Sequence, residues 1–294
     1  MTPTDEIDDA VVDAIGALGN AYRLEVLLAL AERGRELEVD GHAMTFTELY
    51  EAVDIDSSSQ FAYHLERLVG QFVAETEAGY RLTYAGDRIV RVLRSGVYES
   101  APAFEGRALK GVCLGCGSAS LVATLADERF VVRCEACETP VLSDYFPRSQ
   151  TRERSPEAVV ESAATRIWSS SVLLRGGVCP ACYGRVDTTA DRHDHAGQTR
   201  YTHRNTCRTC DLQVHLPVEV AAVSHPRAVG FLWDHGVSLF DLPLWELLGL
   251  LSTGALSTTP HSSEPLEVRV DLSFAGETLS VLVDGSGAAT PLEE

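Results

Sequence analysis

Apolar residues recur at helical spacing over most of the first seventy positions of the chain. Two apolar stripes lie within residues 6–33, and Gly19-Asn20 between them combines a helix stop with a new N-cap. A short third helix is expected after Thr45 or Thr47, because either hydroxyl can cap it. A fourth helix is expected over about 58–70. The pattern therefore predicts four helices before the first strand.

The pattern then changes to strand and returns to helix. Residues 72–76 and 80–83 read as two short strands around a turn that contains Gly79. Helical spacing returns over 85–98. Helix, helix, short helix, turn, helix, hairpin and helix is the order of a winged helix-turn-helix. We therefore predict a winged-helix, DNA-binding domain over residues 1–103.

All eight cysteines lie in the middle of the chain as four Cys-x-x-Cys pairs. Seventeen residues separate the first two pairs, and twenty-four separate the last two. Two such turns facing each other supply the tetrahedral four-sulfur shell that Zn²⁺ prefers. No cysteine is left over, so we predict two structural zinc ions. The expected ligands are Cys113, Cys116, Cys134, Cys137, Cys179, Cys182, Cys207 and Cys210.

Each cysteine set is interleaved with short predicted strands, which is typical of a zinc ribbon. The first ribbon is expected over 104–150 and the second over 177–220, with a connecting helix at 151–176. A valine follows the second pair at the same offset in both ribbons, at Val141 and Val214. We interpret the two ribbons as an internal repeat of one small unit.

Three histidines lie in the longer hairpin of the second ribbon, at His193, His195 and His203. They could compete as zinc ligands or form a second, open site. A catalytic zinc keeps one position open beside three protein ligands, whereas two complete four-cysteine sets leave none. We therefore expect exposed loop histidines and structural zinc, with zinc or thiol sensing as the alternative.

After residue 221 the pattern predicts a small α+β segment that packs on the ribbons or on a second subunit. Its expected elements are helices over 225–234 and 242–251, a polar loop over 252–265, a hairpin over 266–283 and a disordered tail from Gly285. Trp233 and Trp245 could line an effector pocket, or could simply be core aromatic residues. The predicted fold class is α+β multidomain: winged helix, two zinc ribbons, and this helix pair with its β-hairpin.

The net charge of the chain indicates the salt concentration in which the protein works. The chain carries 43 acidic and 24 basic residues, a net charge of −19, and Lys110 is its one lysine. Such an acidic surface repels itself at ordinary salt, whereas molar salt shortens the Debye length to about 3 Å. The composition is typical of cytosolic proteins of extreme halophiles. The alternative is an acidic protein that avoids nucleic acid.

The sequence offers little for export, membrane insertion or catalysis. The N-terminus has no apolar segment like that of a signal peptide, and the most apolar late stretch, 237–251, is broken by charges and proline. We therefore expect a cytoplasmic protein without a membrane partner, whose cysteines bind metal and do not form disulfides. Phosphate-binding loops, nucleophile elbows and zinc-protease motifs do not occur, so no enzyme activity is predicted.

Several stretches together resemble a known family of regulators. Residues 15–27 are similar to the opening helices of arsenical-repressor-type (ArsR-like) winged-helix regulators. Residues 60–68 (QFAYHLERL) resemble that family's recognition helix, and 72–83 its wing. The family's Cys-x-Cys sensing motif is missing from this region. With its cysteine ribbons, the chain also resembles regulators of halophilic archaea and, more distantly, the archaeal general transcription factor E.

The resemblance implies a homodimeric transcriptional regulator that pairs through helices near 7–18 and 85–98. In helix-turn-helix proteins the N-terminal part of the recognition helix enters the major groove, where glutamine can pair with adenine and arginine with guanine. Zinc would stabilise a sensory or partner-docking module. The alternative is an adaptor that contacts RNA polymerase. The candidate DNA-contacting residues are Ser58, Ser59, Gln60, Tyr63, His64, Arg67 and, on the wing, Arg81.

Overall fold

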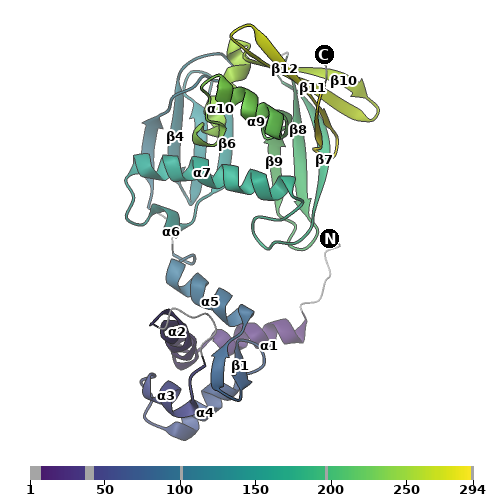
Figure 1. Cartoon of the computed structure of the whole chain (residues 1–294). Helices are drawn as coiled ribbons and strands as arrows, with labels where there is room; N and C mark the ends of the chain where they lie inside the picture. Colours follow the sequence, from purple (N-terminus) through teal and green to yellow (C-terminus); the bar gives the residue numbers. More distant parts are fainter. Residues whose placement is uncertain (1–7, 37–42, 100–101, 196–197, 293–294) are drawn as a thin grey trace. The chain divides into compact units, whose positions relative to one another are not determined.

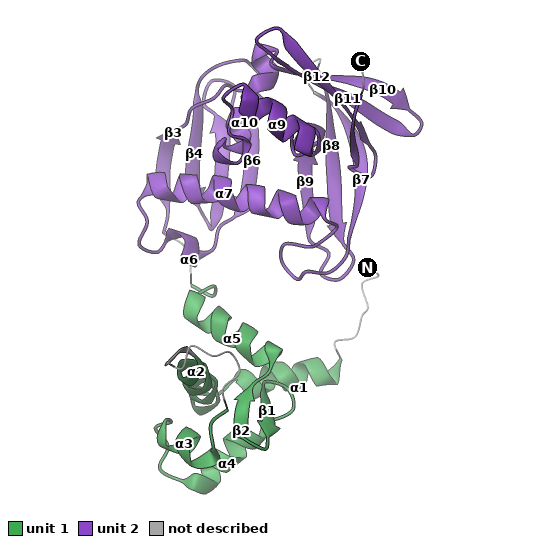
Figure 2. Cartoon of the chain, in the orientation of Figure 1, with its two compact units in different colours: residues 1–99 green, residues 100–294 purple. Residues whose placement is uncertain are grey.

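The computed structural model of the chain describes residues 8–36, 43–99, 102–195 and 198–292 (Figure 1). Two compact units divide the chain (Figure 2). Unit 1 comprises Met1–Glu99, and unit 2 comprises Ser100–Glu294. Unit 2 gathers both ribbons, the helix between them and the C-terminal segment. Each unit is described by itself below.

Unit 1 has an element order compatible with a winged helix-turn-helix. Its elements are α1 (Asp9–Leu18), α2 (Ala21–Glu36), α3 (Phe46–Glu51), α4 (Ser58–Glu66), the antiparallel strands β1 (Val73–Thr76) and β2 (Gly79–Leu82), and α5 (Tyr84–Ser95). The helix expected over 58–70 ends four residues early, at Glu66. The interior of the unit contains completely buried side chains from α2, α3, α4 and the chain that follows, among them Val26, Leu27, Leu49, Phe61, Leu68 and Val73.

Local signals explain where the elements of unit 1 begin. Thr45 caps α3 in a capping box: its hydroxyl accepts the N–H of Glu48 at 3.3 Å, and the Glu48 carboxylate accepts the N–H of Thr45 at 2.8 Å. Gly79 begins β2 with φ of 117°, and a Cβ there would lie 2.3 Å from the carbonyl oxygen of Met44. Only glycine fits this close approach, which lets Met44 and Tyr80 exchange two backbone hydrogen bonds of 2.8 Å.

The described residues of unit 2 form three antiparallel sheets, each with its strands in sequence order. The first sheet is β3 (Phe104–Ala108), β4 (Leu121–Ala126), β5 (Arg129–Cys134) and β6 (Pro140–Tyr145). The second is β7 (Val186–His195), β8 (Gln198–Cys207) and β9 (Gln213–Pro217). The third is β10 (Leu256–Ser263), β11 (Leu266–Phe274), β12 (Glu277–Asp284) and β13 (Ala289–Pro291).

The helices of unit 2 bring these sheets together around one large core. They are α6 (Arg148–Thr151), α7 (Pro156–Arg175), α8 (Val218–Val223), α9 (Pro226–Asp234), the 3-10 turn η1 (Leu239–Asp241) and α10 (Leu244–Thr253). Figure 1 shows α7 running from the first sheet towards the second. Phe130 of the first sheet, Trp168 of α7, Trp245 of α10 and Val270 of the third sheet belong to the same buried cluster. The C-terminal segment therefore packs on the ribbons.

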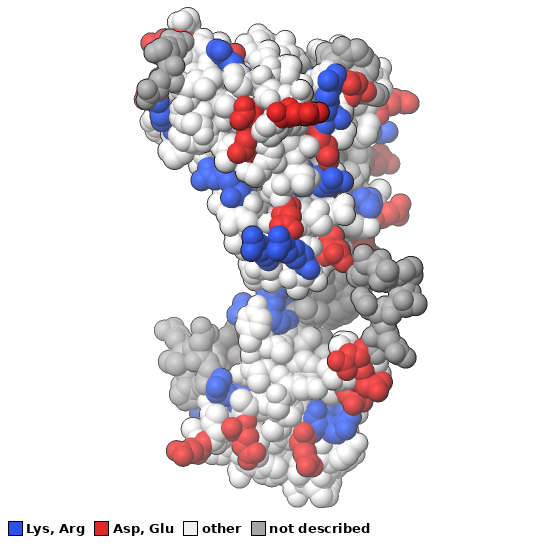
Figure 3. Space-filling model, turned by 90° about the vertical axis from the view of Figure 1, so that its right-hand side faces the viewer, with Lys and Arg blue, Asp and Glu red and all other residues white. Residues whose placement is uncertain are grey.

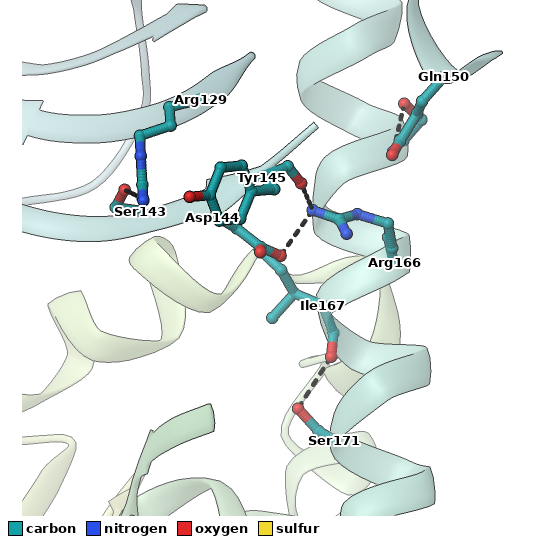
Figure 4. A network of polar contacts seen from close by, with 9 residues as sticks. Arg129, Ser143, Asp144, Tyr145, Gln150, Arg166, Ile167 and Ser171 are labelled. Atoms are coloured by element: carbon teal, nitrogen blue, oxygen red, sulfur yellow. Dashed lines mark hydrogen bonds and ion pairs between the residues drawn. The ribbon is translucent and has the colours of Figure 1, made fainter. Parts of the chain in front are cut away.

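A polar cluster attaches α7 to the edge of the first sheet (Figure 4). One guanidinium nitrogen of Arg166 donates to the Asp144 carboxylate at 2.6 Å and to the carbonyl oxygen of Tyr145 at 2.8 Å. The same guanidinium lies 5.3 Å from the ring centre of Phe146. Because Asp144 and Tyr145 end β6, these contacts fix the end of that strand against the helix.

Two expectations for the C-terminal segment are wrong. The stretch 252–265, predicted to be a polar loop, contains β10, whose one large apolar residue, Leu256, is buried. The tail from Gly285, predicted to be disordered, contains β13, which pairs with β12. Neither strand has an alternating apolar pattern of its own. Each is held in place by its hydrogen bonds to a neighbouring strand. Strand pairing thus supplies order that periodicity does not show.

Trp233 and Trp245 have different environments. Trp245 is buried, with its ring centre 6.4 Å from that of Phe130, whereas Trp233 leaves 69% of its surface exposed. Trp245 is thus a core aromatic, and the two residues do not line one pocket.

The described residues include no single helix long and apolar enough to cross a membrane. Helix α1 and the first part of α2 reach that length and apolarity only when taken together across a bend of 79°. Because α2 buries Val26 and Leu27 in the core of unit 1, this pair is weak evidence for a membrane span.

Candidate metal centres and nucleic-acid interface

The first cysteine set closes at one end of the first sheet. Cys113 and Cys116 lie in the turn before β4, Cys134 ends β5, and Cys137 precedes β6. The Sγ atoms of Cys113 and Cys137 are 3.6 Å apart, and those of Cys116 and Cys134 are 3.7 Å apart. A tetrahedron with Zn–S bonds of 2.3 Å has S–S edges of about 3.8 Å, whereas a disulfide bond measures about 2.05 Å. The donor set fits zinc and no disulfide.

The second set repeats this plan in the second sheet. Cys179 and Cys182 lie before β7, Cys207 ends β8, and Cys210 precedes β9. Cys179 Sγ is 3.7 Å from Cys210 Sγ, and Cys182 Sγ is 3.5 Å from Cys207 Sγ. In both sets the first cysteine of each pair is buried and the second is exposed. The predicted internal repeat is thus present in topology and burial as well as in spacing.

Backbone amides of the cysteine turns point at the sulfur atoms. The N–H of Gly115 donates to Cys113 Sγ at 3.3 Å, and the N–H of Thr209 donates to Cys207 Sγ at the same distance. In the second set, the N–H of Ala181 lies 3.4 Å from Cys179 Sγ. Such bonds favour thiolate over thiol, and they orient the ligands before metal arrives. Both sets therefore suit structural zinc, which would contribute folding free energy.

A hydroxyl near the first centre was not anticipated from the sequence. Thr139 Oγ1 lies 3.2 Å from Cys137 Sγ and can donate to the thiolate. A Cβ on Gly115 would approach the same hydroxyl to 3.3 Å, so the small residue at 115 leaves room for it. The signal in the sequence is weak: a threonine two residues after a ligand.

His193 and His203 lie outside both metal groups. His193 is exposed and hydrogen-bonds Thr202 Oγ1 at 2.9 Å. The side chain of His195 lies outside the described residues. The expectation of an exposed loop is wrong for His203, because β8 pairs with β7 on one side and β9 on the other and places this residue mid-sheet. His203 is buried, its Nε2 contacts the carbonyl oxygen of Asp284 at 3.1 Å, and burial lowers its pKa.

Helix α4 presents a polar face away from the core of unit 1. Ser57 caps the helix by accepting the N–H of Gln60 at 3.4 Å. Of the candidate DNA-contacting residues, Ser58, Ser59, Gln60, Tyr63 and Arg67 are exposed around α4, and Arg81 is exposed on β2. These side chains combine hydroxyl, amide and guanidinium groups, which are the groups that hydrogen-bond base edges and phosphates.

His64 is the exception, and the prediction that it faces outward is wrong. Phe61, His64 and Leu65 occupy positions i, i+3 and i+4 on one face of α4, Leu68 follows the end of the helix, and all four are buried. The His64 ring lies 5.4 Å from that of Tyr22, and among the described residues its Nδ1 has no hydrogen-bond partner. Burial, and secondly the charge of Arg23, lower the pKa of His64, so its neutral form is favoured.

Charge in unit 1 is predominantly acidic. Residues 1–100 hold 8 arginines and no lysine against 19 acidic residues, a net charge of −11. Figure 3 shows acidic and basic side chains interspersed over the visible face of this unit, without a continuous basic area. Readers of DNA usually carry a basic footprint. The exposed groups of α4 therefore offer hydrogen bonds more than charge.

Two family models match the chain. The model of a family described as "Domain of unknown function (DUF7351)" matches residues 110–289. The chain belongs to this family. The DUF7351 match takes in both metal centres and most of the third sheet. A second model, "Domain of unknown function (DUF7347)", matches residues 11–93, from within α1 to within α5. No curated protein and no solved structure matches the chain.

Proposed function

We propose that the protein is a DNA-binding transcriptional regulator of the ArsR-like winged-helix class, acting in the cytoplasm of a halophilic archaeon. Unit 1 would place α4 in the major groove, and the zinc-built unit 2 would serve as a sensory or partner-docking module. The observation that carries this proposal is the division of α4 into a buried face and an opposite polar face at its N-terminal half. We propose a binding protein and not an enzyme.

Each exposed side chain has a specific part in this proposal. Gln60 would make a bidentate contact with adenine, Arg67 one with guanine, and Ser58 and Ser59 would reach base edges or phosphates. Arg81 on β2 would contact the backbone beside the major groove. His64 has no contact with DNA in this arrangement, because it is part of the core.

The acidity of unit 1 determines how salt should act. Counterion release weakens binding in proportion to the number of phosphates neutralised. Few basic groups accompany α4, so the slope of log affinity against log salt should be shallow, about −1 for the one backbone contact assigned to Arg81. Such a DNA-binding protein would keep its affinity in molar salt, to which its acidic composition is suited.

Exposed apolar residues on α1 support a homodimer. Val11, Val12 and Ile15 leave 51%, 56% and 65% of their surfaces exposed on this one ten-residue helix. On α5, Val92 is 41% exposed. Burying such residues against a second copy would remove apolar surface from water. Two copies paired in this way would read half-sites about 34 Å apart along DNA.

Chromatin immunoprecipitation with sequencing, followed by mobility shifts at high salt, tests this proposal. We expect binding at discrete chromosomal sites. Gln60→Ala and Arg67→Ala should each weaken binding to these sites by about 1–3 kcal/mol and alter the base preference. Arg152→Ala is the matched control, because Arg152 is an exposed arginine of unit 2. Unchanged binding by both α4 variants would contradict the assignment of this helix.

The alternative is an adaptor in the transcription apparatus, similar to transcription factor E, that acts through contacts with RNA polymerase. The acidic surface of unit 1 is the observation that favours it. Co-purification with polymerase in the absence of discrete chromosomal sites would select the adaptor over the DNA reader.

A further inference from the structure

A cavity of about 660 Å³ in unit 2 is lined by the second sheet, the C-terminal part of α7, α8, the start of α9 and residues 286–289. This volume lies within the range of small-molecule sites, about 300–1,000 Å³, which are concave and mostly apolar with a few convergent polar groups. The apolar part of its wall is formed by Leu174, Val186, Leu216, Pro217, Val220 and Ala221.

The imidazole of His203 is a buried polar group in the wall of this cavity. His203 is 4% exposed, and its Nε2 lies 3.1 Å from the carbonyl oxygen of Asp284. A carbonyl oxygen only accepts, so Nε2 carries the hydrogen and, in the neutral ring, Nδ1 has a lone pair. Burial lowers the pKa of His203 more than the contacts with Asp284 raise it, which favours the neutral ring.

The Nδ1 atom of His203 is accessible to a ligand. In the part of the chain that the structure describes, this atom has no hydrogen-bond partner, yet it is not sealed from solvent as Nδ1 of His64 is. Gly287 lies beside it without a side chain, and a Cβ there would be 3.8 Å from Nδ1. Asp284 Oδ1 holds this loop in place by accepting the N–H of Ser286 at 2.8 Å and that of Ala288 at 3.0 Å.

The hydroxyl and amide groups of the cavity wall also offer acceptors, because their hydrogens are already used within the protein. Thr188 donates to Asn205 Oδ1 at 2.9 Å, and the Asn205 amide donates to two backbone carbonyl oxygens, each at 3.2 Å. Ser171 and Ser224 each donate to a carbonyl oxygen one helical turn earlier, at 2.9 and 2.6 Å. A ligand must therefore bring hydrogen-bond donors to this wall.

The charged groups of the wall disfavour a cation and favour an acid. Among the described residues that line the cavity, Asp187 is the only carboxylate, and both of its oxygens pair with Arg208, at 2.6 and 2.7 Å. Arg175 also lines the cavity; it is exposed, and its Nη1 donates to the carbonyl oxygen of Ser224. A guanidinium has five N–H donors, so this bond leaves donors for a carboxylate.

We propose that this cavity binds a small phenolic carboxylic acid. The phenol hydroxyl would donate to Nδ1 of His203, the ring would pack against the apolar part of the wall, and the carboxylate would pair with Arg175. A hydroxyl supplies the donor without a positive charge, and a phenol donates more strongly than an aliphatic alcohol because it is more acidic. An amine would be a cation at neutral pH, and the carboxylate of Asp187 is already paired.

Binding here would join the second ribbon to α7 and to the third sheet. His203 belongs to β8, Ser171 to α7, and Gly287 to the connection between β12 and β13. A ligand in contact with all three would stabilise their packing once its concentration exceeds its dissociation constant. This inference goes beyond the proposed function, because it gives unit 2 a ligand and does not depend on DNA binding by unit 1.

Isothermal titration calorimetry on the full, zinc-loaded chain in molar potassium chloride at neutral pH tests the proposal. The probes are 3-(4-hydroxyphenyl)propionate and 4-hydroxybenzoate, and we expect saturable one-to-one binding of at least one. Analogues of the first probe remove one feature each: 3-phenylpropionate lacks the hydroxyl, 3-(4-methoxyphenyl)propionate keeps the oxygen without its hydrogen, and 4-ethylphenol lacks the carboxylate. The two analogues without the donor should bind about tenfold more weakly than the intact probe.

Two results with the unaltered chain would overturn the proposal. One is no saturable binding of either probe. The other is binding of the methoxy analogue as tight as that of the phenol, because a ligand that donates nothing would then be accepted equally well.

Variants assign the two polar contacts to their residues. His203→Gln keeps a donor for the Asp284 carbonyl and loses the acceptor at the Nδ1 position. It should weaken binding of 3-(4-hydroxyphenyl)propionate about tenfold and remove the preference for this probe over 3-phenylpropionate. Arg175→Gln should weaken the acids by about two- to fivefold, because the pair is exposed, and spare 4-ethylphenol.

Each of these variants has a matched control outside the cavity. His193→Gln makes the same change at an exposed histidine of the same sheet, and Arg227→Gln makes it at an exposed arginine of α9. Both controls should bind like the unaltered chain. Unchanged affinity and preference in folded His203→Gln, or an equal loss in His193→Gln, would contradict the assigned site.

Zinc content and far-ultraviolet circular dichroism show whether each variant is folded. If His203→Gln is misfolded, Ala221→Leu replaces it, because it adds bulk to the cavity wall and leaves the histidine in place. We expect this variant to weaken binding of the phenolic acid about tenfold. Unchanged binding by folded Ala221→Leu would place the ligand elsewhere and overturn the proposal.

Discussion

Unit 1 and unit 2 are stabilised by different means. Unit 1 contains no cysteine and depends on an apolar core in which Leu27, Leu49 and Phe61 are completely buried. In unit 2 four cysteines are themselves buried, and Cys113 and Cys134 belong to its large apolar cluster. The metal centres are therefore part of the packing of unit 2. We therefore expect loss of zinc to unfold unit 2 and to leave unit 1 folded.

The two ribbons of unit 2 repeat one plan but differ in their surroundings. Cys113 and Cys134 share a core with Phe130, Trp168 and Trp245, contributed by the first sheet, α7 and α10. Cys179 and Cys207 share only a small cluster with Leu174 and Val186. The metal centre of the first ribbon thus belongs to the large core of unit 2, whereas that of the second ribbon belongs to a small separate cluster.

The largest expected effect sharpens this difference between the ribbons. Cys113→Ala and Cys179→Ala should each reduce the zinc content from two ions to one, measured by native mass spectrometry. Structural zinc contributes about 10–16 kcal/mol in small zinc-binding peptides, so each affected ribbon should unfold locally. We expect Cys113→Ala to abolish the cooperative thermal transition of unit 2, and Cys179→Ala to retain it at a lower midpoint. Equal damage by the two variants would remove the distinction.

A second, smaller effect probes the core of unit 1. Phe61→Ala removes a completely buried ring and should destabilise unit 1 by about 3–5 kcal/mol. Denaturant unfolding followed by segment-resolved hydrogen exchange should assign this loss to unit 1, with zinc content unchanged. Loss of zinc from Phe61→Ala would show that the units depend on each other.

The smallest effect concerns the start of α3. Thr45→Ala removes one half of the capping box and should cost about 1 kcal/mol, seen as a lower denaturation midpoint for unit 1. Thr47→Ala is the matched control, because Thr47 lies inside α3 and the capping hydroxyl belongs to Thr45. A larger loss from the control than from Thr45→Ala would contradict the cap.

Features coded by spacing along the chain could be predicted from the sequence. The four Cys-x-x-Cys pairs and the helix–hairpin–helix order of unit 1 are patterns of that kind, because each depends on residues that are close together in sequence. The inward position of His64 also follows from the sequence, because His64 falls on the apolar stripe of Phe61, Leu65 and Leu68. The expectation that it faces outward follows from its polarity alone.

Other features depend on residues far apart in sequence, and no local pattern reveals them. Strand β10 exists because β11 pairs with it, and its own sequence has little apolar content. A cavity of unit 2 that Glu219 and Arg200 line likewise draws on five segments that are distant in sequence. The burial of Glu219 could not be predicted, because a glutamate in the first turn of a helix is ordinarily exposed.

Hydrogen exchange with mass spectrometry on the full chain, before and after chelation of zinc in molar salt, tests the contrast between the units most directly. We expect amides within residues 110–289 to lose protection after chelation, while those of α2, α4 and the β1–β2 hairpin keep theirs. Restoring zinc should restore the first group. Loss of protection in both units together, or full protection of unit 2 without metal, would contradict the claim that zinc holds unit 2 and leaves unit 1 independent.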